Sequence, residues 1–254
     1  IDDYEAKRLA LEGWITEDAA SRVLSAAGMD FAALKKASST RGFRGAATGM
    51  KASMSVRNDV RKATSYNVVG KVSGSSRPHE AFVYTAHWDH LGKNADPKPG
   101  EDPIFNGAQD NATGVSALIE LGRAFAAMKP APERSVMFVA VTAEESGLLG
   151  SEYFAAHPPI PVAQMVAGVN MDNLYSVGQT RDMTVIGYGK SELDDWLTQA
   201  AATQNRTIRG ELDVKAGWFY RSDQISFARV GVPAIWFKSG VDFIGHEPGW
   251  GEQQ

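Results

Sequence analysis

The chain contains no cysteine among its 254 residues. Disulfide bonds and thiolate metal ligands are therefore excluded, and any metal site must use histidine, aspartate or glutamate. The chain also lacks an apolar run long enough to cross a membrane as a helix. It has no basic stripe, and its net charge of -4 argues against a nucleic-acid partner.

Two regions of the sequence differ in pattern. Residues 1–62 start with amphipathic helical segments, which Thr16 and Asp30 are expected to cap, and continue as a Gly-, Ser- and Arg-rich linker. Residues 63–254 alternate short apolar strands with helical patterns. This alternation predicts an α/β fold with three α/β/α layers, in which helices cover both faces of a mixed, mostly parallel sheet.

The expected elements can be given by residue range. The predicted strands are 66–72, 81–86, 135–141, 165–171, 183–186 and 234–237. The predicted helices are 17–27, 31–36, 112–128, 148–156, 192–204 and 223–228, the last with Ser222 as its cap.

Histidine or acidic side chains follow three of the predicted strands. They are His87 with Asp89, the pair Glu144–Glu145, and Asp172. A lone pair of glutamates is usually solvated surface. Strand ends, however, are where ligands bind in α/β sheets, and the same pattern occurs here three times. Two adjacent carboxylates at such a turn point in different directions, so one can bind a metal while the other moves a proton.

A Gly- and Asn-rich loop, residues 106–114, brings Asp110 to the start of a helical pattern. Asp110 could simply cap that helix. If Asp110 lies at the same edge of the sheet as the other carboxylates, their negative charges repel one another strongly unless cations neutralise them. Imidazole with carboxylate is a ligand set that suits zinc, and shared carboxylates suit a cluster of two metals.

Four motifs in series resemble those of the co-catalytic zinc aminopeptidases, the family that also contains glutamate carboxypeptidase II, the transferrin receptor and glutaminyl cyclase. The motifs are His87-x-Asp89, Gly107-Ala-x-Asp110-Asn-Ala-Thr-Gly, Glu144-Glu145-Ser-Gly-Leu-Leu-Gly-Ser and Asn170-x-Asp172. The resemblance covers residues 63–240. It implies a zinc peptidase catalytic domain in residues 63–254. Residues 1–62 would be the exit of an inserted protease-associated domain.

The resemblance assigns metal ligands. His87, Asp110 and Asp172 would bind the first of two zinc ions, and Asp110 and Glu145 the second. The family also places a cis peptide after the bridging aspartate, which here is the bond from Asp110 to Asn111.

The resemblance also assigns catalytic residues. Glu144 would be the general base that takes a proton from water and passes it to the leaving amine. The carboxylate of Asp89 would hold one nitrogen of His87 while the other nitrogen binds metal.

The segment Tyr220-Arg221-Ser222-Asp223 resembles an Arg-Ser-Asp-His motif beside the substrate cleft of the family, with Gln224 in place of the histidine. Tyr220, Arg221 and Asp223 are therefore expected to contact substrate. The aromatic run 218–220 could wall a pocket for an apolar side chain or pack in the core, and the sequence favours neither.

The last metal ligand of the family is a histidine in a Tyr-His-x-Pro-Ser-Asp-like context. His246 lacks that context, and residues 249–252 resemble the segment that precedes it. We therefore expect the true ligand to lie beyond residue 254, with His246 as the alternative. The complete protein would hold two zinc ions, and this chain one or none, with low activity. His90 is expected to be structural, and His79 and His157 to be solvated.

Taken together, the motifs predict a zinc-dependent exopeptidase that acts on peptides, with an aminopeptidase favoured. A carboxypeptidase or a glutaminyl cyclase on the same scaffold is the enzyme alternative. A non-catalytic, receptor-like homologue is the other alternative, and the presence of Glu144 beside the ligands argues against it. Because the resembled bacterial peptidases are exported and Ile1 is not an initiator methionine, a secreted or periplasmic location is expected.

Overall fold

The computed structural model describes residues 13–57, 59–174 and 178–253. The chain divides into two compact units between Ala63 and Thr64. The first unit contains α1 (Glu17–Ala26) and α2 (Phe31–Ser38). Both helices are capped as predicted, because the Thr16 hydroxyl and the Asp30 carboxylate each accept a hydrogen bond from a main-chain N–H in the first turn.

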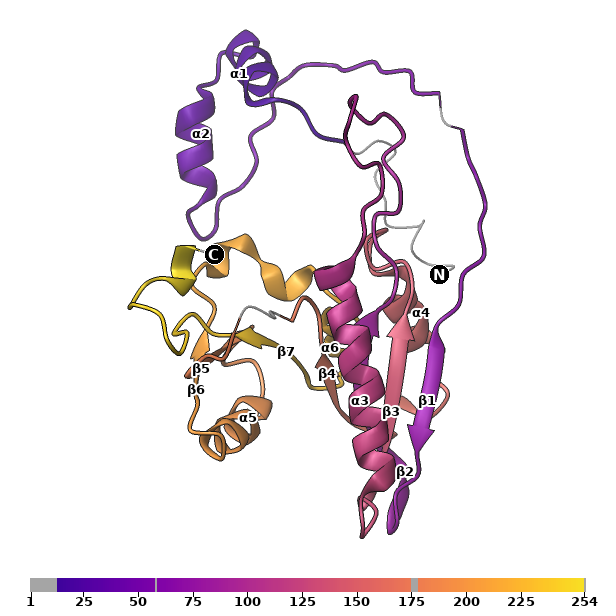
Figure 1. Ribbon diagram of the computed structural model, residues 1–254. Coiled ribbons are helices and arrows are strands. Elements are labelled where there is room, and N and C mark those ends of the chain that lie inside the picture. Colours follow the sequence, from indigo (N-terminus) through magenta and orange to yellow (C-terminus); the bar gives the residue numbers. More distant parts are fainter. Residues whose placement is uncertain (1–12, 58, 175–177, 254) are drawn as a thin grey trace. The chain divides into compact units, whose positions relative to one another are not determined.

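The second unit is built on a sheet whose described strands have the order β1-β3-β2-β4-β7-β5-β6 (Figure 1). The strands are β1 (Val68–Val72), β2 (Arg77–His87), β3 (Arg134–Val141), β4 (Met165–Asn170), β5 (Asp182–Ile186), β6 (Thr207–Gly210) and β7 (Ala234–Ser239). β2 runs parallel to both β3 and β4, β4 to β7, and β5 to β6. β1 is antiparallel to β3, and β5 to β7. The sheet is thus mixed and mostly parallel, as predicted.

Helices cover both faces of this sheet because its central strands are apolar on both sides. On one face, Leu118 of α3 (Thr113–Ala127) packs with Ala86 of β2. On the other face, Phe154 of α4 (Leu149–Ala156) and Phe227 of α6 (Gln224–Arg229) pack with Val83 of β2. Residues 83 and 86 point to opposite faces, since side chains alternate along a strand. α5 (Leu193–Ala202) lies against β6.

Two local features differ from the prediction. β6 was not predicted. Ser222 does not cap α6, whose N-terminal boundary residue is Asp223 with no side-chain capping bond. The Ser222 hydroxyl donates to the Asp172 carboxylate instead, because the end of β4 lies within its reach.

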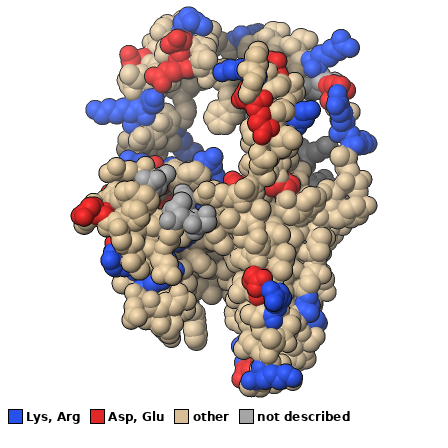
Figure 2. Space-filling model, viewed as in Figure 1, with Lys and Arg blue, Asp and Glu red and all other residues tan. Residues whose placement is uncertain are grey.

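Acidic and basic side chains lie beside one another on the face shown in Figure 2. At the amino-terminal ends of β2 and β3, Arg77 contacts Glu133, and the Arg134 Nε atom lies 2.5 Å from a Glu80 carboxylate oxygen. Charges at this end of the sheet therefore neutralise one another. Within the described ranges, no helix has the length and apolarity needed to cross a membrane.

Candidate metal centre

The carboxyl ends of β2, β3 and β4 meet at one edge of the sheet. The strand register places His87 beside Val141 of β3, and Thr85 beside Asn170 of β4. His87 is the last residue of β2 rather than the first residue after it. Because the three strands are parallel, the residues that follow each of them are brought together, as ligand sites in α/β sheets require.

The first candidate group is His87, Asp110 and Asp172. One ligand atom from each residue lies within 4.8 Å of the others. The Nε2 atom of His87 is 3.0 Å from Oδ1 of Asp110 and 3.4 Å from Oδ1 of Asp172. His87 is 1% exposed and Asp172 is 7% exposed, so most of the group is shielded from water. One imidazole nitrogen and two carboxylate oxygens thus converge, which is a ligand set that zinc accepts.

The imidazole of His87 is held by the main chain of Asp89. Its Nδ1 atom is 2.9 Å from the Asp89 carbonyl oxygen, which leaves Nε2 facing the two carboxylates. The predicted contact through the Asp89 carboxylate is not formed. That carboxylate instead accepts a hydrogen bond from the main-chain N–H of Glu144, at 3.3 Å. After β2 the chain turns so that the carbonyl faces the ring and the side chain reaches the turn that follows β3.

Asp172 is oriented by two buried side chains. The Ser222 hydroxyl donates to Oδ2, and the Trp236 Nε1 atom donates to the Asp172 carbonyl oxygen at 3.0 Å. Ser222 in turn accepts a hydrogen bond from Asn170 at 2.8 Å. With Oδ2 occupied, Oδ1 is the oxygen that faces His87. Such outer partners fix the direction in which a ligand presents its lone pair.

Asp110 lies in the segment Ala108–Ala112, directly before α3, where the main chain is kinked and both Asp110 and Asn111 have non-helical backbone angles. The peptide bond from Asp110 to Asn111 is cis, as expected. The Asn111 side chain fastens this turn to the end of β4, donating to the Met171 carbonyl at 2.9 Å and accepting from Gly114 N–H at 3.1 Å. A Cβ atom on Gly114 would lie 2.2 Å from the Met171 oxygen, so glycine is required there.

The second candidate group is His90, Asp110 and Glu145, whose ligand atoms also lie within 4.8 Å of one another. The Nδ1 atom of His90 is 2.7 Å from Oε1 of Glu145. Asp110 belongs to both groups, so all four predicted metal ligands meet at this edge of the sheet. His90 was expected to be structural. The sequence feature that could have singled it out is its position three residues after His87, in the same turn.

The raised pKa values of His87 and Glu144 indicate that negative charge exceeds positive charge around these side chains. Burial lowers the pKa of His87, but hydrogen bonds and charge from Asp110 and Asp172 outweigh burial and raise it to about 11. Burial, together with the negative charge of Asp223, raises the pKa of Glu144 to about 8. Hydrogen bonding to His87 lowers the pKa of Asp110. A divalent cation at the centre would supply the positive charge that these carboxylates favour.

The three residues predicted to contact substrate differ in exposure. Tyr220 and Arg221 are exposed, and the guanidinium carbon of Arg221 is 4.6 Å from the ring centroid of Trp218. Asp223 is 0% exposed, which does not fit a direct contact with substrate. Gln224 is also buried, and it donates to the Phe219 carbonyl and accepts from Asn170. Gln224 therefore supports the segment from within the core.

Asp223 was expected to contact substrate, but the structure places its carboxyl group in the interior. Burial raises its pKa to about 7, against a smaller lowering by the nearby Ser151 hydroxyl. That hydroxyl makes its hydrogen bonds with the Leu148 carbonyl and with Ser226. Among the residues that the structure describes, neither Asp223 oxygen has a hydrogen-bond partner. The charge of this carboxyl group contributes to the raised pKa of Glu144.

A cavity of about 320 Å³ is lined in part by Trp218, Lys238 and Glu211. The ammonium of Lys238 lies 4.5 Å from the Trp236 ring centroid and 5.7 Å from that of Trp218. Burial lowers the pKa of Lys238, and the negative charges of Asp172 and Asp110 oppose this shift. Sequence reasoning missed Lys238. A larger cavity of about 710 Å³, near Thr180, contains none of the predicted site residues.

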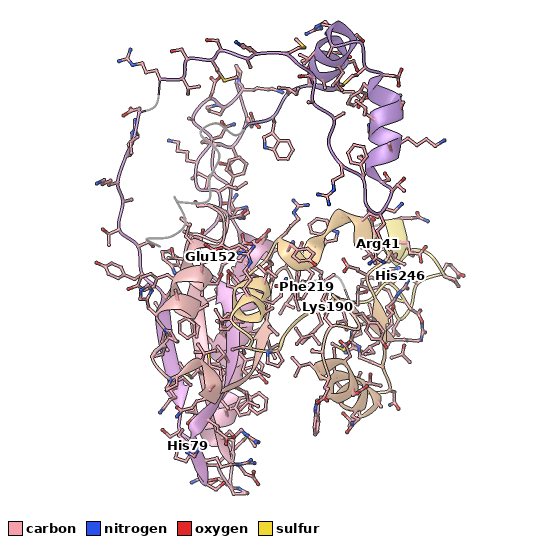
Figure 3. All side chains as sticks on the ribbon, turned by 180° about the vertical axis from the view of Figure 1, so that it is seen from behind. Arg41, His79, Glu152, Lys190, Phe219 and His246 are labelled. Atoms are coloured by element: carbon pink, nitrogen blue, oxygen red, sulfur yellow. The ribbon has the colours of Figure 1, made fainter. Side chains whose placement is uncertain are left out.

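Aromatic residues 218–220 divide between the two predicted environments. Trp218 lines the smaller cavity, whereas Phe219 is 8% exposed and packs in the core. Lys190 lies 4.8 Å from the Phe219 ring centroid (Figure 3). His246, also labelled there, stacks on Trp250 with 3.8 Å between ring centroids. In the described part of the chain, His246 belongs to neither candidate metal group.

Residues 67–253 match Peptidase family M28. The chain belongs to peptidase family M28. It is 33% identical over 105 residues to a probable zinc metalloprotease of Pyrenophora teres f. teres, covering 41% of this chain and 22% of that protein. It is 34% identical over 96 residues to aminopeptidase YwaD of Bacillus subtilis, covering 37% of this chain and 18% of YwaD.

The M28 fold is also evident from a solved structure. LapA aminopeptidase of Legionella pneumophila superimposes with a TM-score of 0.54 at 24% identity, over 72% of this chain and 46% of LapA. The two curated relatives are matched over only about a fifth of their length. The family and the fold are therefore established, together with the predicted likeness to zinc aminopeptidases.

Proposed function

We propose that this M28 chain is a zinc-dependent aminopeptidase, which removes residues from the amino terminus of peptides. The convergence of His87, Asp110 and Asp172 at the strand ends, with Glu144 one residue before Glu145, is the observation that carries the proposal. Family membership and the likeness to YwaD and to a probable zinc metalloprotease support it.

The residues of the first group fit a zinc ion. They provide one imidazole and two carboxylates, and the Oδ1 atoms of Asp110 and Asp172 both face the Nε2 atom of His87. A cation at this point would neutralise the two carboxylates. Zinc bound there would polarise the carbonyl group of the scissile bond and lower the pKa of the attacking water.

Glu144 is the residue that moves the proton. Its ionised carboxylate can accept a proton from water and release it to the leaving amine. Its main chain is fixed by the hydrogen bond to the Asp89 carboxylate. Asp89 thus positions two functional residues, because its carbonyl oxygen also holds His87.

The cavity beside Lys238 is the substrate pocket in this proposal. Trp218 offers an aromatic face, and Lys238 offers an aliphatic stem and a positive charge close to the first group. Arg221 stacks over Trp218 and is exposed, so it can contact the part of a peptide that extends toward solvent. The assignment of residues 1–62 to the exit of an inserted domain and the secreted or periplasmic location stay predictions.

Hydrolysis of matched peptides tests the proposal. We expect the zinc-loaded chain to release the first residue of a peptide with a free amino terminus and to leave the N-acetylated peptide intact. Release of the last residue would indicate a carboxypeptidase, and ring closure of an N-terminal glutamine would indicate a glutaminyl cyclase. A chain that binds zinc and peptide but catalyses none of these reactions would be a receptor-like homologue, and the proposal would be wrong.

A further inference from the structure

The cavity of about 320 Å³ contains an acidic side chain that the proposed mechanism does not use. This is Glu211, which comes directly after β6 and lines the cavity together with Ile186, Trp218 and Lys238. The volume is at the small end of the range for ligand pockets, and it suits one side chain rather than a longer stretch of peptide. A substrate side chain that enters the cavity would therefore lie beside Glu211.

The carboxylate of Glu211 is oriented by the end of β5. Its main-chain N–H donates to the Val185 carbonyl at 3.2 Å, and its Oε1 atom accepts from the Gly187 N–H at 3.1 Å. Gly187 has φ = +82°, and a Cβ atom there would lie 2.2 Å from the Phe219 ring, so the main chain at this point is closely packed. These contacts occupy Oε1 and leave Oε2 for another partner.

The Oε2 atom of Glu211 is buried and makes no hydrogen bond within the described ranges. Buried polar atoms without a partner are uncommon in folded proteins. Because a carboxylate oxygen only accepts hydrogen bonds, a ligand that satisfies it must be a donor, and a cationic donor forms the strongest bond.

The charges that line the cavity are unequal. Among the described lining residues, Lys238 is the single cation, against the two carboxylates of Glu211 and Asp213. No ion pair in the described part of the chain joins Lys238 to either carboxylate. Arg221 stacks on the Trp218 ring but does not line the cavity. Negative charge is therefore in excess, and Glu211 is not neutralised by a neighbouring side chain.

We infer that this cavity selects peptides whose first residue is lysine or arginine, and that Glu211 binds the cation of that side chain. The inference rests on the proposed function, because that function makes the cavity a substrate pocket. The aliphatic stem of the substrate side chain would pack on Trp218 and Ile186, and its charged end would donate to Oε2 of Glu211.

Two other preferences are possible for a cavity with these walls. If Lys238 governed selection, its ammonium would bind an acidic side chain. If the apolar walls governed selection, an aliphatic side chain would bind best. Lysine, glutamate and norleucine distinguish the three cases, since norleucine has an unbranched side chain like that of lysine but lacks the ammonium group.

Binding of these free amino acids to the zinc-loaded chain, measured by calorimetry, tests the inference without hydrolysis. We expect lysine to bind roughly 10-fold more tightly than norleucine, and glutamate to bind most weakly. In Glu211→Gln the advantage of lysine should disappear, because the amide oxygen can still accept from Gly187 but the negative charge is lost. Glu120→Gln, on the exposed face of α3, is the matched control and should keep the advantage.

Two further measurements make the result decisive. Norleucine should bind equally well to Glu211→Gln and to the unaltered chain, which shows that the variant is folded. Lys238→Met should bind lysine more tightly, because a like charge is removed from the cavity. The inference is wrong if the unaltered chain binds norleucine or glutamate as tightly as lysine, or if Glu211→Gln keeps the preference for lysine. Selective binding of lysine by a chain that hydrolyses no peptide would contradict the proposed function alone.

Discussion

The carboxylates at the two ends of the same strands have opposite surroundings. At the amino-terminal ends of β2 and β3, Arg77 and Arg134 face Glu133 and Glu80, so each carboxylate has a guanidinium beside it. At the carboxyl ends, acidic residues that include Glu144 converge on one buried histidine. The charges at the amino-terminal ends balance one another, whereas those at the carboxyl ends would be balanced only by a bound cation.

The difference indicates that the candidate functional residues lie at the carboxyl ends of the strands. Ion pairs near the surface contribute little to stability, so removal of the amino-terminal pairs should cost little. Crowded, half-buried carboxylates repel one another and destabilise the folded chain until a cation binds. The same repulsion strengthens the binding of a cation at the carboxyl ends. Substitutions at the two ends should therefore differ in kind, and the following experiments measure by how much.

The largest effect is expected for Glu144→Gln. An amide cannot accept a proton from water, so turnover should fall by roughly 10²- to 10⁴-fold while zinc stays bound. Steady-state kinetics with a free amino-terminal peptide and a zinc assay would measure both. Glu120→Gln, on the exposed face of α3, is the matched control and should be as active as the unaltered chain. Equal turnover in the two variants would remove Glu144 from the role of base.

A smaller effect is expected for Ser222→Ala, which frees the Oδ2 atom of Asp172. Loss of an outer partner should weaken zinc binding at the first group by about 10- to 100-fold. Competition with a chromogenic chelator would measure it. Ser116→Ala, on the exposed side of α3, should leave zinc affinity unchanged. The comparison fails if Ser116→Ala weakens zinc as much as Ser222→Ala does.

Zinc removal should make stability depend on pH. The pKa of His87 is raised from 6.5 to about 11. The stability that this shift provides is fully present below pH 6.5 and is lost as the pH rises toward 11. The raised pKa of Glu144, about 8, acts in the same direction, because the folded state holds its proton more tightly than the unfolded state does. In a chelator, Tm should therefore fall between pH 6 and pH 9.

Added zinc should reverse that fall, because the ion replaces the proton on His87 and binds more tightly as pH rises. Differential scanning calorimetry at each pH, with zinc and with chelator, would show it. A Tm in chelator that rises from pH 6 to pH 9 would contradict the charge balance described for this end of the sheet.

The smallest effect is expected for Glu80→Gln at the amino-terminal ends. Arg134 lowers the pKa of Glu80 by hydrogen bonding, but the pair is only half-buried, so solvent and salt partly screen it. Zinc affinity should not change, and Tm should shift by little. A loss of zinc in this variant would show that the two ends of the strands are coupled.

Much of the fold followed from the sequence because apolar strands alternate with helical segments along residues 63–254. β6 was missed because it is a four-residue edge strand with a single aliphatic side chain, and pairing with β5 stabilises it. No periodicity can be read from so short a segment. Caps at Thr16 and Asp30 were predictable because they depend only on neighbouring residues.

Convergence of the four predicted metal ligands was predictable for a similar reason, since parallel strands bring their carboxyl ends together. Side-chain directions within loops were not. Asp89 was predicted to hold His87 through its carboxylate, but the turn presents the carbonyl oxygen instead. His90 stands three residues after His87, which marks it as a candidate, but its contact with Glu145 forms only when distant segments pack together. The same is true of the contact between Ser222 and Asp172.

Gly114 has a consequence for the size of the metal centre. α3 begins so close to the end of β4 that a single methyl group would not fit between its first turn and the Met171 carbonyl. Any larger residue would push the start of α3 outward and carry Asp110 away from Asp172. The separation of these two carboxylates therefore depends on the close approach of the main chain at Gly114 to the main chain at Met171. In this way a glycine helps to set the size of ion that would fit between them.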